Sequence, residues 1–370
     1  MTFVLGIIGL GFLVFFHELG HFIAARLSGV KVEAFSIGMG PVLLHHQHKE
    51  TDYRISLIPL GGYCAMKGEQ DFKNALEDNL KTIEAGKDSF YGVHPLKRLL
   101  IAFAGPLFNF IFGFLAFFLI AIIGYTYYTA GNKVSMADEI YPELHSSAHE
   151  AGLESGDAIV SLNKTPVSDF SEIASFVSTH PDEDIIIEVE RNGARLEFTV
   201  HTDLDKETGS GKIGIVSDRN SIQKKEHERK NFPGAVKEGL TESLKVIAMT
   251  IKSVRILFKG VKVQNAVSGP ARITSMLGDT IQAGFSTGLR AGIVSTLELL
   301  AVISISLFLT NLLPVPVLDG GLIVFAFIEF VSRKKLSPKL LYYIQMVGIV
   351  IIGALMVFAL FGDFLYFIKK

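Results

Sequence analysis

The sequence lacks several features that mark secreted scaffolds and nucleic-acid-binding proteins. Its 370 residues include one cysteine, Cys64, and no tryptophan. A single cysteine excludes an internal disulfide and a cysteine-rich zinc finger, because both need several thiols. The formal net charge is −2, and no strip of basic and aromatic residues follows the chain, so no nucleic-acid partner is expected. Cys64 is interpreted as a small apolar packing residue.

Long apolar runs are abundant instead. Hydrophobic residues make up 49% of the chain. A transmembrane helix needs about 20 predominantly apolar residues, and four stretches meet that requirement: 2–25, 99–125, 291–313 and 340–361. The first stretch lacks the basic start of a signal peptide and exceeds the usual apolar core of about 7 to 15 residues, so it is interpreted as a retained span. We therefore predict an α-helical polytopic membrane protein with four transmembrane helices.

Basic residues near the span ends predict the orientation of the chain. Arg26 and Lys31 follow the first span, Arg98 directly precedes the second, and the cluster 333–339 precedes the fourth. Lys and Arg are enriched in cytoplasmic loops, so both short connecting regions are predicted to be cytoplasmic. The C-terminal pair 369–370 opposes this prediction but is the smaller set.

Composition divides the chain into four regions. Residues 1–127 hold the first two spans, 128–222 have a soluble composition, 223–287 form a linker and an amphipathic helix, and 288–370 hold the last two spans. Within the soluble region, the turn Ala-Gly-Leu-x-x-Gly-Asp leads into a strand that ends in Asn. This pattern resembles a PDZ domain of bacterial proteases, so the fold class includes an inserted α+β PDZ-like domain.

The third region predicts an amphipathic helix. Apolar residues recur every three or four positions from Val236 to Phe258, with basic residues between them. Such a helix lies in the membrane interface or packs on the PDZ-like domain, and its basic face favours the interface.

The segment between the first two spans predicts a β-hairpin. Tyr53, Ile55 and Leu57 alternate with polar residues, and the breakers within 59–62 indicate a sharp turn before a second short strand. The charged run 69–87 is interpreted as a solvated helix or loop. Histidines at positions 45, 46 and 48 lack the spacing of a helical ligand pair and are interpreted as part of a solvated loop.

One motif in the first apolar run carries the chemistry. His17 and His21 are four residues apart, so on a helix they project from the same face and can bind one zinc ion, while Glu18 reaches water beside it. Ionisable residues inside a span are costly, by about 2.5 to 3.5 kcal/mol for Asp, Lys or Arg, and a bound metal would compensate. A buried histidine bonded to a neighbouring helix would explain one of these residues, but not the whole motif.

A catalytic zinc site uses three protein ligands and keeps one open position. Asp319 is the best candidate for the third ligand, because it lies just after the third span in a segment broken by two prolines and two glycines. Irregular backbone at membrane depth is tolerated where it lines a cavity or is buried in protein. At the helical rise, His17 lies roughly 13 Å and Asn109 roughly 16 Å from the basic ends of their spans. These polar groups are therefore predicted to share one layer.

Three motifs together resemble a known family. They are 17–21, Gly105-Pro106-Leu107-Phe108-Asn109 and Leu318-Asp319-Gly320, in this order, with the PDZ-like insert between the second and third spans. Nearly the whole chain resembles the site-2 protease family of intramembrane zinc metalloproteases. Many close relatives carry two PDZ domains, whereas this chain has room for one.

The resemblance implies roles for particular residues. One Zn²⁺ ion per chain would be bound by His17, His21 and Asp319, with Glu18 as the catalytic base. The resemblance also places Asn109 in a substrate-contacting motif. It further implies that segment 58–63, including Gly61, Gly62 and Tyr63, belongs to a membrane-dipping β-hairpin that contacts substrate.

The predicted activity is therefore that of a zinc metalloendopeptidase in the lipid bilayer of a bacterial inner membrane. It would cleave transmembrane protein substrates, such as anti-sigma factors or signal-peptide remnants, with the active site towards the cytoplasm and the PDZ-like domain outside. A zinc transporter is an alternative, but the glutamate inside the histidine pair and the PDZ-like insert disfavour it. A non-catalytic PDZ scaffold would leave the intramembrane motif unexplained.

Overall fold

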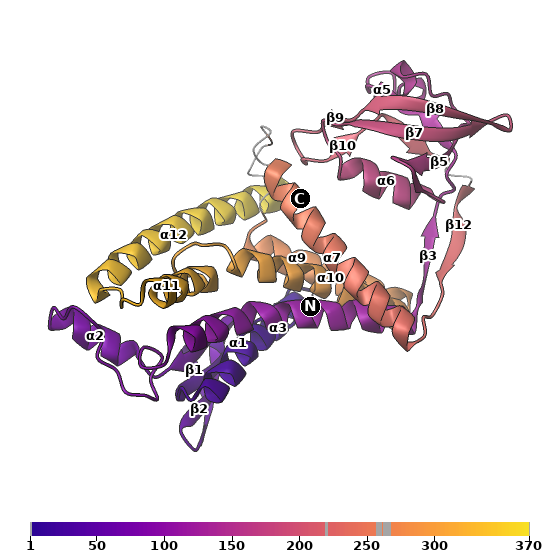
Figure 1. Ribbon diagram of the computed structural model, residues 1–370. Coiled ribbons are helices and arrows are strands. Elements are labelled where there is room, and N and C mark those ends of the chain that lie inside the picture. The colour runs from indigo at the N-terminus through magenta and orange to yellow at the C-terminus, as the bar shows by residue number, and fades with distance from the viewer. Residues whose placement is uncertain (1, 219–220, 257–260, 262–267, 370) are drawn as a thin grey trace. The chain divides into compact units, whose positions relative to one another are not determined.

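The computed structural model describes residues 2–218, 221–256, 261 and 268–369 (Figure 1). The chain divides into two compact units. The first combines Met1–Ile123, Lys230–Ile247 and Gly269–Lys370, and the second combines Gly124–Arg229 and Ala248–Ser268. The amphipathic helix predicted from Val236 to Phe258 lies within the described residues up to position 256, and its last two positions lie outside them.

Four long apolar helices dominate the first unit. They are α1 (Thr2–Ser28), α3 (Pro95–Ile123), α10 (Leu289–Asn311) and α12 (Pro338–Lys369). Each is long and apolar enough to cross a membrane, which confirms the four predicted stretches as helices and fits a polytopic membrane protein. Helix α1 packs against α3 and α9 (Pro270–Thr287), and α3 packs against α10 as well (Figure 1).

Glycine permits the close approach of α1 and α3. A Cβ atom at Gly20 of α1 would collide with the carbonyl group of Ala104, and a Cβ atom at Gly105 of α3 would collide with the imidazole of His21. Small residues at helix contacts let backbones approach closely in membranes. The second motif therefore lies directly against the first.

The sequence did not predict a further short helix in this unit. Helix α11 (Asp319–Ser332) has 14 residues, which is too short for an ordinary span. It packs against α3 and follows an irregular connection in which Val317 adopts φ 89°. Asp319 is consequently the first residue of a separate helix.

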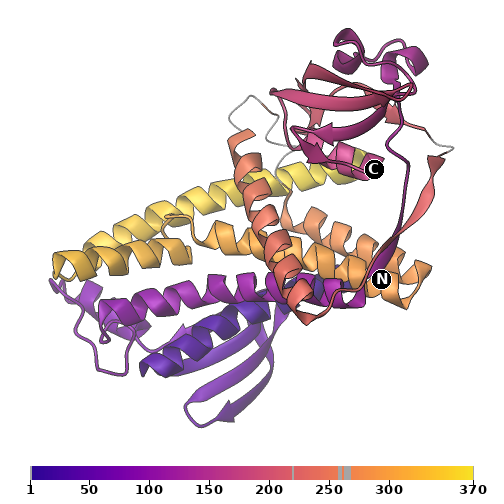
Figure 2. The same cartoon turned by 45° about the vertical axis from the view of Figure 1, so that its right-hand side comes forward.

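The predicted hairpin exists, and it contains one turn more than the sequence indicated. Strands β1 (Val32–His48) and β2 (Thr51–Met66) pair as a long antiparallel ribbon that turns at residues 49–50 (Figure 2). Residues 59–62 lie inside β2, where Gly61 absorbs an irregularity with φ 109°. Glycine tolerates this conformation without ending the strand. Residues 34–37 of β1 pair with 52–55 in rising order and with 62–65 in falling order. The two halves of β2 therefore run in opposite directions on either side of β1, and the chain reverses between them at the predicted breakers.

Two loop interpretations also need correction. The histidines at 45, 46 and 48 lie in strand β1 and are exposed. The charged run forms α2 (Glu69–Glu77) and a following segment, and it is more than a solvated surface. Ala75 and Ile83 are buried with Leu341 of α12, because apolar side chains at intervals in this run face a common cluster.

The second unit is built around a four-stranded sheet. Its order is β6-β5-β7-β8, all in antiparallel pairs, and helix α6 (Phe170–Ser178) packs beside it. The strand predicted after the Ala-Gly-Leu-x-x-Gly-Asp turn is confirmed at Ala158–Leu162, and Ile159, Ile185 and Ile187 are fully buried. The elements of this sheet and of the smaller parts around it are β5 (Ala158–Leu162), β6 (Thr165–Pro166), β7 (Asp184–Arg191), β8 (Ala194–His201), β4 (Val134–Met136), α4 (Ala137–Ile140), α5 (Ser147–Glu150), β9 (Asp203–Leu204), β10 (Gly211–Lys212) and β11 (Ile215–Ser217).

The predicted linker is more regular than expected. Strand β12 (Gln223–His227) pairs with β3 (Tyr125–Thr129) as an antiparallel ribbon. Helix α7 (Phe232–Ile256) follows, which confirms the predicted helix over its described part. The first part of α7 packs on α3, where a Cβ atom at Gly239 would lie 3.0 Å from the backbone nitrogen of Phe118.

Candidate metal centre

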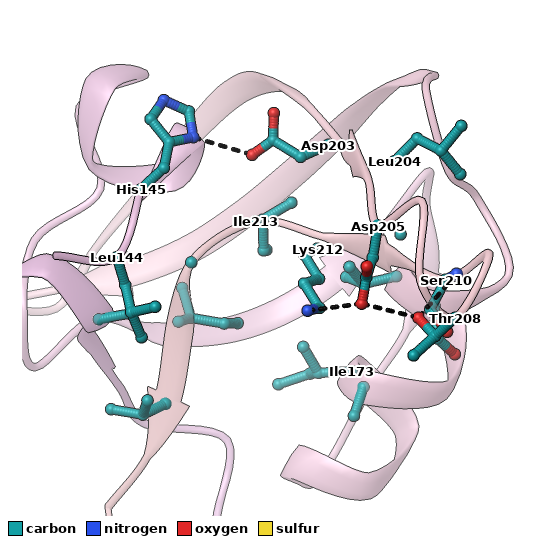
Figure 3. Close-up of a pocket in the computed structure, with 18 of the residues that line it drawn as sticks. Leu144, His145, Ile173, Asp203, Leu204, Asp205, Thr208, Ser210, Lys212 and Ile213 are labelled. Carbon is teal, nitrogen blue, oxygen red and sulfur yellow. Dashed lines mark hydrogen bonds and ion pairs between the residues drawn. The ribbon is translucent and has the colours of Figure 1, made fainter. Parts of the chain in front are cut away.

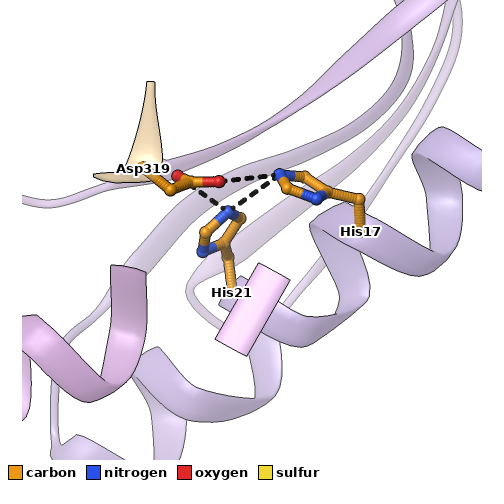
Figure 4. Close-up of side chains that lie close together, drawn as sticks. All are labelled: His17, His21 and Asp319. Carbon is orange, nitrogen blue, oxygen red and sulfur yellow. Dashed lines mark hydrogen bonds and ion pairs between the residues drawn. The ribbon is translucent and has the colours of Figure 1, made fainter. Parts of the chain in front are cut away.

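The structure brings His17, His21 and Asp319 together (Figure 4). Asp319 Oδ2 lies 3.1 Å from His17 Nε2, and Asp319 Oδ1 lies 3.3 Å from His21 Nε2. The two Nε2 atoms are 3.2 Å apart. The two histidines come from α1 and the aspartate from α11, so side chains about three hundred positions apart in the sequence meet at one site.

His21 is held by the second motif. Its Nδ1 lies 2.8 Å from the carbonyl oxygen of Ile101, to which a protonated Nδ1 donates. The side chain packs on Gly105, where no other residue would leave space. His21 is only 7% exposed. Its Nε2 atom is therefore the one directed at Asp319.

Asp319 has favourable local electrostatics as well. It occupies the first turn of α11, where unpaired backbone N–H groups and the helix dipole stabilise a negative charge. Gly320 and Gly321 follow it, and a Cβ atom at Gly321 would lie 2.6 Å from the carbonyl oxygen of Val315. The glycines allow the chain to turn tightly into the helix and present the carboxylate to α1.

Asn109 lies in the predicted layer but has no exposed surface. Its Nδ2 is 3.1 Å from His17 Nδ1. Asn311 lies at the same ring atom, with its Nδ2 3.5 Å from His17 Nδ1. Sequence reasoning did not single out Asn311, although its position at the start of the proline-broken segment was a usable signal.

Strand β2 lies against Glu18. The carboxylate of Glu18 accepts a hydrogen bond from the backbone N–H of Cys64. A Cβ atom at Gly62 would lie 3.3 Å from Glu18 Cγ and 3.0 Å from Val14 Cγ1. The strand can approach this closely because residue 62 has no side chain. Tyr63 has a different contact, since its hydroxyl accepts a hydrogen bond from Arg54 at 3.1 Å.

The donor set fits a catalytic zinc ion. The ligand atoms of His17, His21 and Asp319 all lie within 4.8 Å of one another. Two imidazole nitrogens and one carboxylate oxygen are a three-ligand combination used by catalytic zinc, which keeps a further position open. The side chains of His17 and Asp319 each retain 14% exposure, so the group is not sealed.

A buried ion pair fixes the far end of α11. Arg98 of α3 donates a hydrogen bond to Glu329, and the residues are 7% and 6% exposed. Glu329 also accepts from the backbone N–H of Leu336 at 2.8 Å. The helix that begins with Asp319 is thus tied to α3 near its other end.

Asp363 has a clear contact that its sequence context did not reveal. Its carboxylate accepts hydrogen bonds from the backbone N–H groups of Gly269, Ala271 and Arg272 at 2.8, 2.9 and 3.2 Å. Asp363 of α12 therefore caps the N-terminus of α9. The cap requires glycine at position 269, since a Cβ atom there would collide with the carboxylate.

Apolar helices of membrane-spanning length that assemble two histidines and a carboxylate define a class, the membrane-embedded metalloproteins. The comparison with known sequences is more specific. The sequence profile of peptidase family M50 matches residues 5–355. The chain belongs to this family, the site-2 protease family, and is a membrane-associated zinc metalloprotease.

Similar proteins with names describing zinc metalloproteases occur in several bacteria. A protein of Treponema pallidum is 33% identical and covers 97% of this chain and 98% of its own length. A Campylobacter jejuni protein is 35% identical, covering 98% of this chain and 93% of its own length. A Helicobacter pylori protein is 32% identical over 98% of both chains. The similarity therefore extends through both units.

Proposed function

We propose that the protein hydrolyses peptide bonds within or near transmembrane segments of other membrane proteins, using one zinc ion held by His17, His21 and Asp319. The observation that carries this proposal is the meeting of the three donors on α1 and α11, among helices of membrane-spanning length. Ionisable groups at such a depth are costly unless they serve a site.

Each residue has a distinct part in the proposed reaction. When bound, zinc supplies Lewis acidity that activates water and polarises a carbonyl group. Glu18 acts as the general base, because its carboxylate interacts with both His21 and His17 and can take the proton of the attacking water. The same carboxylate then transfers this proton to the leaving amine. The N–H of Cys64 holds the Glu18 carboxylate in place between these transfers.

The hairpin supplies a means of holding substrate. A transmembrane helix must unwind locally before its carbonyl group is attacked, and its freed backbone groups then need partners. Among the described residues, segment 62–66 of β2 pairs with β1 alone, and it contacts Glu18. Addition of a substrate strand to this edge would place a peptide bond beside the catalytic base. In the proposal, Gly62 and Tyr63 belong to this substrate-binding edge, and Gly61 directly precedes it.

The second unit carries a groove of about 900 Å³ (Figure 3). Ile173 and Ile213 provide apolar walls, while Lys212 pairs with Asp205 at 2.7 Å in its lining. We interpret the unit as a PDZ-like domain, spanning about 128–222, with two possible roles. It captures a C-terminus exposed by an earlier cut, or it excludes proteins with large folded extracytoplasmic parts. A truncation lacking this domain should widen the substrate range if exclusion is correct, and should abolish cleavage of trimmed substrates if capture is correct.

The proposed location is a bacterial inner membrane, with the zinc centre towards the cytoplasm and the PDZ-like domain outside. The basic residues at the ends of α1, α3 and α11 support this orientation. Anti-sigma factors and signal-peptide remnants are the proposed substrate classes, because both present single transmembrane segments.

A cleavage assay on a panel of transmembrane peptides tests the proposal. The wild-type chain should cut within the apolar segment, and Glu18→Gln should reduce the rate by about 10² to 10⁴-fold, the usual contribution of a general base. Zinc content should be unchanged in this variant. Zinc flux across vesicles that survives Glu18→Gln, without any cleavage, would instead identify a transporter.

A further inference from the structure

Asn109 has a buried polar side chain, and the proposed reaction gives it no role. It has no exposed surface, and Ser304 of α10 fixes its backbone by donating to the Asn109 carbonyl at 2.9 Å. A side chain enclosed in this way is poorly placed to touch a substrate. Its amide nevertheless lies 3.1 Å from His17 Nδ1.

The chemistry of His17 requires an acceptor at that position. His17 directs Nε2 at Asp319 and at His21 Nε2, so Nε2 is the ligand atom. A neutral imidazole that binds a metal through one nitrogen carries its proton on the other. Nδ1 of His17 is therefore a donor in the metal-bound state, and a buried donor without an acceptor is costly.

The amide of Asn109 contains the missing acceptor. Its Oδ1 is buried and has no hydrogen-bond partner among the described residues, while Nδ2 faces the histidine. Rotation of the amide by half a turn exchanges these two atoms, so that Oδ1 accepts from His17 Nδ1. The rotation gives Oδ1 the partner that it lacks.

His21 shows the same arrangement on the same helix. Its Nδ1 contacts the backbone carbonyl of Ile101 at 2.8 Å, and its Nε2 faces Asp319. Helix α3 thus holds the outer nitrogen of both histidines, through a backbone oxygen in one case and a side-chain amide in the other. Outer contacts of this kind fix the tautomer and orientation of metal-binding histidines.

We propose that Asn109 is a positioning residue that holds His17 in the metal-binding tautomer, and that it does not bind substrate directly. This inference rests on the proposed metal site and assigns the second motif a task within it. Asn311 is the less favoured partner, because it is farther from His17 Nδ1, at 3.5 Å, and is only partly buried.

The test compares zinc affinities of the detergent-solubilised full-length chain by competition with a chelator. Asn109→Leu preserves size and removes the acceptor, so its zinc dissociation constant should rise about 10 to 100-fold. Asn109→Asp keeps an oxygen acceptor and should restore affinity to within about threefold of wild type. Asn311→Leu is the matched control and should cost less than Asn109→Leu. At saturating zinc, the Asn109→Leu variant should keep the wild-type KM.

Other outcomes would overturn the proposal. An unchanged zinc affinity with a raised KM in Asn109→Leu would indicate substrate contact, and equal losses in the Leu and Asp variants would exclude the acceptor role. His17→Ala separates this failure from a failure of the metal site. If His17→Ala retains zinc, the proposed site is wrong; if it loses zinc while Asn109→Leu does not, only the role of Asn109 is wrong.

Discussion

The ion pair between Arg98 and Glu329 allows a sharp prediction about stability. Both side chains are buried, and the contact to Glu329 is made by an Nη atom of Arg98, while Arg98 Nε has no hydrogen-bond partner among the described residues. Removing one member of a buried ion pair typically costs about 3 to 5 kcal/mol, because the remaining charge stays desolvated and unpaired. The two single variants should nevertheless differ. Arg98→Met leaves the carboxylate with only the N–H of Leu336, whereas the amide of Glu329→Gln can still accept from Arg98.

We therefore expect Arg98→Met to lose about 3 to 5 kcal/mol of unfolding free energy and Glu329→Gln to lose less. The double variant Arg98→Met with Glu329→Leu should lose far less than the sum, since no charge remains buried. The remaining loss is that of the hydrogen bond from the Leu336 N–H, which contributes about 1 kcal/mol of unfolding free energy. The assay is reversible unfolding of the detergent-solubilised chain. Additive losses, or single losses below about 0.5 kcal/mol, would refute a coupled buried pair.

Two further predictions concern other parts of the chain. Gly105→Ala should weaken zinc binding because its methyl group collides with the His21 ring, whereas Gly353→Ala, where a Cβ atom meets nothing within 4 Å, should have no effect; equal effects would contradict the packing argument. In the second unit, burial raises the pKa of Asp157, but hydrogen bonds from Arg191 outweigh it and hold that pKa below its ordinary value. The stabilisation that the Asp157–Arg191 contact gives the fold is complete above the ordinary pKa of an aspartate, and it is lost as the pH falls through the lowered pKa of Asp157. Arg191→Met should therefore lower the local stability of β5 and β7 at neutral pH by about 2 kcal/mol, which is measured as faster hydrogen exchange. A loss of stability that stays the same below about pH 3 would contradict the role of the Asp157 charge.

The spans were predictable because continuous apolar runs carry their own signal, independent of distant contacts. The reversal within the hairpin at 59–62 was predictable too, because Pro59 and Gly61 are breakers and Gly61 adopts φ 109° there. The turn at 49–50 was not. It forms where Lys49 adopts φ 53°, and no proline or glycine marks it in the sequence.

Pairings between distant residues account for most of what the sequence did not reveal. Glu329 is 231 positions from Arg98, and Asp363 is 94 positions from Gly269, so neither contact has a periodicity to detect. Asp319 was an exception. Its chemistry completed the donor set of the two histidines, and the number of ligands that catalytic zinc requires pointed to one more oxygen or nitrogen atom.

X-ray absorption at the zinc edge of the purified full-length protein tests the central claim most directly. The account predicts one zinc per chain with two imidazole nitrogens and a carboxylate oxygen at about 2.0 to 2.2 Å, and Asp319→Ala should remove the carboxylate contribution. A sulfur ligand at about 2.3 Å, which only Cys64 or a methionine could provide, or a zinc environment unchanged by Asp319→Ala, would contradict the proposed centre.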